Sequence, residues 1–202
     1  MNNFLAKTKE FCKKHSPIII PTAVLTIICV VVTLALSSTN VLTEKRIGDN
    51  TKRTKKEAMQ KLISADEYTE ITEKLGDENV TYNKALKNGE AIGYIFTVNG
   101  KGYGGEVSVM TAVDTDGKII AVEILDASGE TPGLGQNVTK DTFYKSYSGL
   151  SDEISVVKNQ PNKENNEIQA VTGATISSKA VTSSVNKALK YSAQINAKED
   201  IK

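Results

Sequence analysis

Residues 91–125 of the chain read AIGYIFTVNGKGYGGEVSVMTAVDTDGKIIAVEIL, and they contain three candidate strands in a row. In the first, residues 91–98, apolar side chains alternate with their neighbours at period two, as in a half-buried strand. Residues 104–113 and 118–125 flank the sequence Asp-Thr-Asp-Gly, a turn signal typical of a hairpin. The stretch therefore predicts consecutive antiparallel strands joined by short turns.

Helices are expected on both sides of these strands. Residues 53–64 place apolar side chains on one helical face, whereas residues 66–79 carry no clear pattern. The other expected elements are a weak strand at 81–86, a short helix at 139–147, a last strand at 153–157, a polar loop at 161–167 and a helix from about 175 to 194. This order predicts an α+β fold with an antiparallel sheet and packed helices.

The N-terminal part contains one candidate membrane span. Residues 18–36 carry no charge, and as a helix they would extend about 28 Å, close to the thickness of a hydrocarbon core. The alternative is a cleaved signal peptide, whose apolar region is usually shorter, roughly 7–15 residues. We expect an uncleaved anchor, with an N-terminus at 1–17, a transmembrane helix at 18–36, a juxtamembrane linker at 37–52 and a globular domain at 53–202.

The net charge of +1 hides two parts of opposite sign. Residues 1–56 hold ten basic and three acidic side chains, whereas residues 57–202 hold fifteen basic and twenty-one acidic ones. An acidic domain argues against nucleic acid as a partner, and lipid headgroups explain the basic part more simply. Because basic residues lie on both sides of the span, charge alone leaves its orientation undecided.

The scarcity of cysteine and histidine excludes several classes of function. Cys12, Cys29 and His15 are the only such residues, so the chain has none from residue 30 onward. Zinc, haem and iron–sulfur sites draw on these side chains, and a Ser-His-Asp or Cys-His hydrolase needs an imidazole base. Redox or covalent chemistry in the domain must therefore be done by a group bound to it.

The sequence TGATISS, residues 172–178, lies where the last predicted helix begins. Unpaired N–H groups and partial positive charge at a helix N-terminus suit an anion such as a phosphate. The alternative is an ordinary N-cap, for which one hydroxyl suffices although four are present. The residues that we assign to this candidate site are Thr172, Gly173, Ala174, Thr175, Ser177 and Ser178.

A second candidate stretch is ETPGLG, residues 130–135, which follows a predicted strand. A proline and two glycines predict a fixed, exposed loop that displays Leu134 for contact with a planar ligand; the alternative is an ordinary surface turn. The glycine-rich turn at 99–105 has the same two interpretations, a tight hairpin or close approach to a ligand. From the loop we include Glu130, Thr131, Gly133, Leu134 and Gly135 in the candidate site.

The pair ETPGLG and TGATISS, in this order after one anchor helix, resembles the FMN-binding domain family. Within that family the chain is similar to the G subunit of the Rnf ion-translocating electron-transport complex and to the C subunit of the Na⁺-translocating NADH:quinone reductase. The resemblance implies covalent FMN, joined through a phosphoester to the last threonine of the signature, here Thr175. The family signature usually has Asp where this chain has Gln169.

What the resemblance implies is a membrane-anchored flavoprotein electron carrier. Its complex would pass electrons from reduced ferredoxin to NAD⁺ and translocate Na⁺ or H⁺. The implied partners are the other subunits, the membrane lipid and a flavin transferase that attaches the FMN. The domain would lie outside the cytoplasm, which makes residues 1–17 cytoplasmic.

Three alternatives stay open at this stage. The first keeps the chemistry and makes the chain a quinone-reductase subunit or a stand-alone flavin carrier. The second is a non-redox binding module with a capped helix and no flavin. The third is a hydrolase that uses Thr175 or Ser178 with Lys179 as base, although adjacent helical residues diverge by about 100° and are poorly aimed for it.

Overall fold

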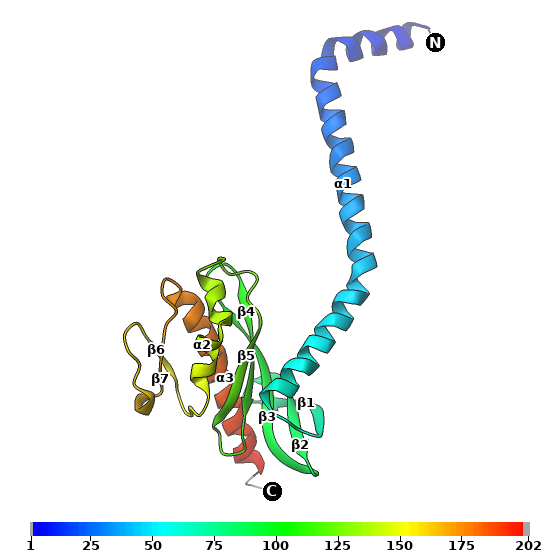
Figure 1. Ribbon diagram of the computed structural model, residues 1–202. Coiled ribbons are helices and arrows are strands. Elements are labelled where there is room, and N and C mark those ends of the chain that lie inside the picture. The colour runs from blue at the N-terminus through cyan, green and yellow to red at the C-terminus, as the bar shows by residue number, and fades with distance from the viewer. Residues whose placement is uncertain (1, 200–202) are drawn as a thin grey trace. The chain divides into compact units, whose positions relative to one another are not determined.

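The structure, a computed structural model, describes residues 2–199 (Figure 1). The chain divides into two compact units, one up to Lys52 and one from Arg53. Helix α1 (Asn2–Leu62) belongs to both, because it continues without interruption through residues 37–52 and through most of the separate helix expected at 53–64. The segment expected as a linker is therefore helical.

One stretch of α1, Ile20–Asn40, is long and apolar enough to cross a membrane, and it lies near the N-terminus of the described residues. Its large apolar side chains are exposed. Its threonine hydroxyls are bonded within the helix: those of Thr22, Thr26 and Thr33 each donate to the carbonyl four residues earlier, at 2.7–2.8 Å. Such internal bonding is what a hydrocarbon environment demands of polar groups.

The second unit is built on a five-stranded antiparallel sheet in the order β1-β2-β3-β4-β5. The strands are β1 (Glu67–Leu75), β2 (Glu78–Lys87), β3 (Glu90–Lys101), β4 (Glu106–Val113) and β5 (Ile119–Asp126). Asn88 and Gly89 both have positive φ between the paired residues Lys87 and Glu90, which is the geometry of a two-residue type I′ hairpin. The weak strand expected at 81–86 is β2, and β1 lies in the stretch 66–79, which carried no clear pattern.

Helix α3 (Thr175–Glu199) packs against β3 and β4 on one face of the sheet. The main core lies between them, where the alternating residues Tyr94 and Phe96 meet Val181 and Val185 of the helix, all at most 1% exposed. The opposite face of the sheet is covered in part by the end of α1, whose Leu62 packs in a smaller cluster. The α+β prediction is confirmed, with an apolar layer on each side of the sheet.

The connection from β5 to α3 differs in detail from the expected elements. The helix expected at 139–147 is two short pieces, α2 (Asp141–Tyr144) and the 3-10 turn η2 (Lys145–Tyr147), and another 3-10 turn, η1 (Gly135–Thr139), precedes them. The strand expected at 153–157 is β6 (Ser155–Val157), and it is not the last strand, because β7 (Glu167–Gln169) pairs with it in parallel. The polar loop between them contains a third 3-10 turn, η3 (Lys163–Asn165).

Candidate functional site

Three segments that are far apart in the sequence line one cavity of about 680 Å³. They are the turn between β3 and β4, the loop after β5, and the first turn of α3. The lining residues are Tyr103, Glu130, Thr131, Leu134, Gly135, Gly173, Ala174, Thr175, Ile176 and Ser177. The volume lies in the range of small-molecule and cofactor sites, about 300–1,000 Å³.

Glu130 holds the three segments together. Its side chain is only 2% exposed, and its Oε1 accepts a hydrogen bond from the N–H of Gly104 at 3.2 Å. Its Oε2 accepts a bond from the hydroxyl of Ser177, 47 residues further along the chain. One buried carboxylate therefore joins the loop after β5 to the β3–β4 turn and to α3.

The electrostatics of this carboxylate follow from its neighbours. Burial is the largest single influence and raises the pKa of Glu130. The hydroxyl of Ser177 and the N–H groups of Gly104, Tyr103 and Gly105 donate to the charged form, and together they bring the pKa below its ordinary value. Glu130 is therefore ionised at neutral pH.

Two glycines leave the space that Glu130 occupies. A Cβ on Gly102 would lie 2.0 Å from its Oε1, and a Cβ on Gly135 would lie 2.3 Å from its Oε2. Both separations are far below van der Waals contact, and the obstructing group is buried and bonded. Gly102 of the glycine-rich turn and Gly135 of ETPGLG thus allow the backbone to close around the carboxylate.

The four hydroxyls of TGATISS differ in whether they form hydrogen bonds within the protein. Ser177 donates to Glu130, and the Ser178 hydroxyl accepts from the N–H of Val171 and donates to the carbonyl of Ala174. Both of these side chains are buried. Thr172 is exposed and Thr175 is half-buried, and neither hydroxyl has a hydrogen-bond partner within residues 2–199. Two of the four hydroxyls are therefore free.

The start of α3 supplies the anion-binding geometry that the sequence predicts. Gly173 turns the chain with φ +76°, and the first helical hydrogen bond runs from the N–H of Ser178 to the carbonyl of Ala174. The N–H groups of Thr175, Ile176 and Ser177 precede that bond and point out of the helix end. Thr175, whose hydroxyl is free, lies in the same turn and lines the cavity.

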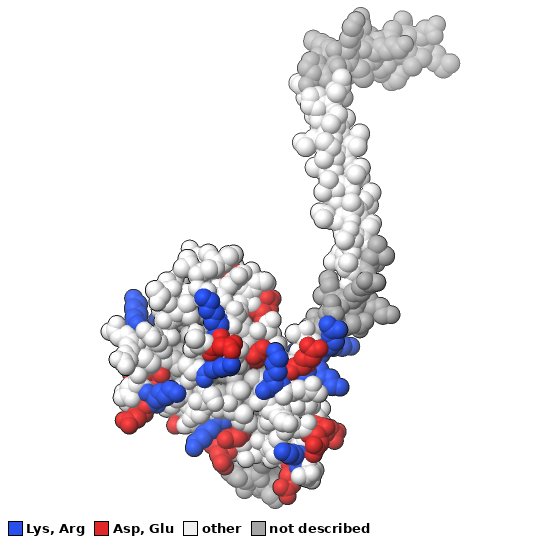
Figure 2. Space-filling model, in the orientation of Figure 1, with Lys and Arg blue, Asp and Glu red and all other residues white. Residues whose placement is uncertain are grey.

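The rim of the cavity is apolar and carries no exposed charge. Tyr103, Leu134 and Ile176 are 73%, 47% and 53% exposed, and they are the exposed large apolar side chains among residues 53–198. The segments 102–105, 127–139 and 170–178 contain one charged residue, the buried Glu130. Figure 2 shows, on the face in view, that the top of the domain, where α3 begins in Figure 1, is largely free of charged side chains. An uncharged, partly aromatic rim suits a flat organic ring.

The structure brings together most of the residues predicted from the sequence. Glu130, Thr131, Leu134, Gly135, Gly173, Ala174, Thr175 and Ser177 line the cavity. Thr172, Gly133 and Ser178 do not line it. Sequence reasoning missed Tyr103, although it lies in the glycine-rich turn, and Ile176, the large apolar residue within TGATISS.

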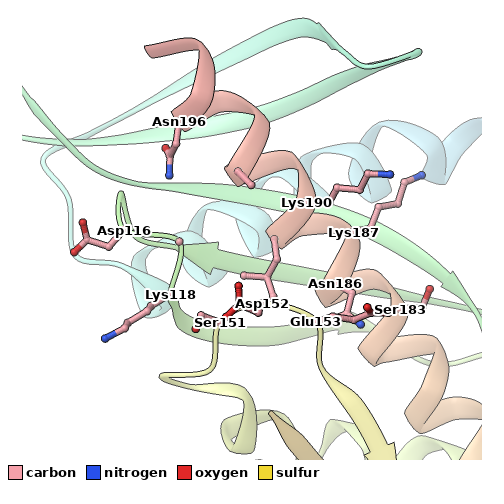
Figure 3. A pocket seen from close by; sticks show the side chains of 13 residues that line it. Asp116, Lys118, Ser151, Asp152, Glu153, Ser183, Asn186, Lys187, Lys190 and Asn196 are labelled. Carbon is pink, nitrogen blue, oxygen red and sulfur yellow. The ribbon is translucent and has the colours of Figure 1, made fainter. Parts of the chain in front are cut away.

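A second cavity, of about 810 Å³, lies along the later turns of α3 and contains none of these residues (Figure 3). Its wall mixes Lys118, Lys187 and Lys190 with Asp116 and Asp152. Asn186 in this wall has a structural role, because its side-chain amide accepts a hydrogen bond from the N–H of Ile154 and donates one to the carbonyl of Ile154. Among the residues that the structure describes, no group of three His, Cys, Asp or Glu side chains could hold a metal ion.

The fold and the first cavity define a cofactor-binding α+β domain that follows a candidate membrane helix. The FMN-binding domain model matches residues 102–190, which include all three segments of the cavity. The solved structure of NqrC from Shewanella oneidensis has a similar fold, with a TM-score of 0.55 and 18% identity over 70% of this chain and 72% of that one.

Two curated relatives are similar over most of their length. The G subunit of the proton-translocating ferredoxin:NAD(+) oxidoreductase complex of Clostridium ljungdahlii is 34% identical, covering 88% of this chain and 92% of that protein. The G subunit of the Na(+)-translocating ferredoxin:NAD(+) oxidoreductase complex of Acetobacterium woodii is 35% identical, covering 81% and 86%. The chain therefore belongs to the family of Rnf complex G subunits, which contain an FMN-binding domain.

Proposed function

We propose that the protein is a membrane-anchored electron carrier that holds FMN through a phosphoester bond to Thr175. The observation that carries the proposal is that Thr175, whose hydroxyl has no hydrogen-bond partner among the described residues, begins α3 and lines the cavity. The bond makes Thr175 an attachment point, with no part as a nucleophile in turnover. The site is a binding site, and the redox chemistry comes from the flavin.

The residues present fit FMN at both of its ends. A phosphodiester on Thr175 would keep one negative charge beside the N–H groups that open α3, which favour anions. The flavin ring is flat and largely apolar, and Tyr103, Leu134 and Ile176 offer an apolar rim beside that point. Bound FMN accepts and donates one or two electrons; the protein fixes its position and supplies the surrounding charge.

The place of this carrier in a larger assembly follows from the relatives. Both named relatives are subunits of complexes that couple ferredoxin:NAD(+) oxidoreduction to movement of protons or Na⁺. We assign the same role to this chain, with the other subunits as redox partners and a flavin transferase as the enzyme that attaches FMN. The candidate span within α1 would anchor it in lipid, with the FMN domain outside the cytoplasm.

The attachment is tested by producing the full chain together with a flavin transferase and separating the denatured protein on a gel. We expect flavin fluorescence at the position of the wild-type chain and none for Thr175→Ala. Thr172→Ala is the matched control, because Thr172 is the other free hydroxyl of the motif and its loss should leave the fluorescence unchanged. A dark wild-type band, or a bright Thr175→Ala band, would refute the assignment.

The side of the membrane is tested by thiol labelling in intact cells. Asp116 lies in the exposed turn between β4 and β5, so Asp116→Cys places a reactive thiol on the domain away from the site. The variant is made in a chain whose own cysteines, Cys12 and Cys29, are replaced by Ser, because Cys12 lies on the other side of the span and would be labelled in the opposite orientation. A membrane-impermeant maleimide should label this variant in intact cells. Labelling only after lysis would place the domain in the cytoplasm and contradict the proposal.

A further inference from the structure

We propose that Glu130 is a positioning residue whose buried negative charge, which forms no ion pair among the described residues, lowers the reduction potential of the flavin bound at Thr175. The inference rests on the proposed function, since it needs a flavin in the cavity. It goes further in giving the carboxylate an electrostatic role besides its role in joining the three segments.

The first support is the location of the charge. Glu130 and Thr175 line the same cavity, so a flavin attached at Thr175 would have the carboxylate in its wall. Glu130 is 2% exposed, and bulk water therefore screens its charge poorly. A charge at such a position acts on the cavity more strongly than any of the exposed side chains of the domain.

The second support is that no cation neutralises it. Among the described residues, the ion pairs of the domain involve Glu57, Glu123, Asp141, Glu78 and Glu73, and none involves Glu130. The carboxylate is stabilised by dipoles instead, namely the Ser177 hydroxyl and backbone N–H groups. Dipoles keep the group ionised without bringing the opposite unit charge that an ion pair would place beside it.

The consequence for the flavin follows from electrostatics. Each electron that the bound flavin accepts adds negative charge to the cavity, and the Glu130 carboxylate repels that charge. The oxidised form is thereby favoured over the reduced form. Removal of such a repulsion in a poorly screened cavity should change the equilibrium constant for reduction by about tenfold.

The test uses the full chain carrying FMN and the substitution Glu130→Gln. Glutamine has the same shape, its carbonyl accepts from the N–H of Gly104, and its amide donates to the Ser177 hydroxyl, so the segments stay joined. The matched control is Glu106→Gln, an exposed glutamate at the start of β4, on the same hairpin as Gly104. The midpoint potential is measured by titration with dithionite against a redox dye.

We expect Glu130→Gln to change the equilibrium constant for reduction about tenfold in favour of the reduced flavin, which raises the midpoint potential of a one-electron couple by about 59 mV. Glu106→Gln should shift it far less. Equal potentials in Glu130→Gln and the wild type would overturn the inference, whatever happens to the stability, because a purely structural role leaves the potential unchanged. Wild-type protein without flavin after production with a transferase would overturn the proposed function and this inference with it.

A second measurement does not depend on any variant. Reduced-minus-oxidised infrared difference spectra of the wild type, with and without ¹³C-labelled glutamate, report whether an ionised glutamate responds to reduction of the flavin. We expect a carboxylate band that shifts on labelling, since Glu130 is the carboxylate in the cavity wall. Absence of any label-sensitive band would contradict the inference even if Glu130→Gln failed to fold.

Discussion

The contact between Gly135 and Glu130 makes Gly135→Ala a sharp test of the carboxylate as the joint of the site. The new Cβ would lie 2.3 Å from Oε2 of Glu130 and 2.9 Å from the hydroxyl oxygen of Ser177. It would therefore push apart the two atoms that hold the loop after β5 to α3. Neither partner has space to retreat, because Glu130 and Ser177 are 2% and 1% exposed.

The magnitude combines two costs. Overpacking a buried site costs about 1–3 kcal/mol. Loss of a hydrogen bond to a charged group adds about 1.5–3 kcal/mol. The free energy of unfolding should therefore fall by about 3–5 kcal/mol, which for a domain of this size lowers Tm by about 10 °C.

The assay is thermal unfolding of the full chain in detergent, followed by near-ultraviolet circular dichroism of tyrosine, because the sequence has seven tyrosines and no tryptophan. Gly133→Ala in the same loop is the control. Its φ of +76° strains an alanine, but a Cβ there meets nothing within 4 Å, so only the backbone term of about 1–2 kcal/mol applies. A Tm for Gly135→Ala equal to or above that of Gly133→Ala would refute the reasoning.

Two further predictions concern Glu130 and Asn186. The pKa of Glu130 is lowered in the folded state, so the stability that its ionised form contributes is complete above the ordinary pKa of 4.5 and is lost as pH falls through the lower folded value. The free energy of unfolding of Glu130→Gln should therefore depend less steeply on pH below 4.5 than that of the wild type. Equal slopes would contradict the lowered pKa. Asn186 bonds the N–H and the carbonyl of Ile154 at 3.0 and 2.9 Å, so Asn186→Ala should cost about 3 kcal/mol in urea unfolding. A loss below about 1 kcal/mol would show that water replaces both bonds.

Much of the fold could be predicted because it follows local patterns. Strands β3 to β5 alternate apolar and other residues around recognisable turns, and α3 keeps one apolar face against the sheet. Strand β1 carries no such signal, since it lies at the sheet edge and is mostly exposed. Strand β7 is three residues long and exists because β6 pairs with it, which no local pattern indicates.

The site was predictable in its components and less so in their assembly. The hydroxyls of TGATISS indicate an anion site, but only the structure separates the bonded Ser177 and Ser178 from the free Thr172 and Thr175. The sequence places Glu130 in the candidate site without giving its partner, because Ser177 lies 47 residues away. Long-range hydrogen bonds of this kind depend on how the sheet and α3 pack, and so cannot be derived from local sequence.

The central claim is that Thr175 carries covalent FMN, and mass spectrometry of peptides from the full chain tests it most directly. The chain is produced with a flavin transferase, digested, and the peptide that contains Thr175 is fragmented. We predict that this peptide is heavier by one esterified FMN, that fragmentation assigns the added mass to Thr175, and that the Thr175→Ala peptide lacks it. An unmodified Thr175 peptide from protein that is yellow, or FMN mass on another residue, would contradict the account.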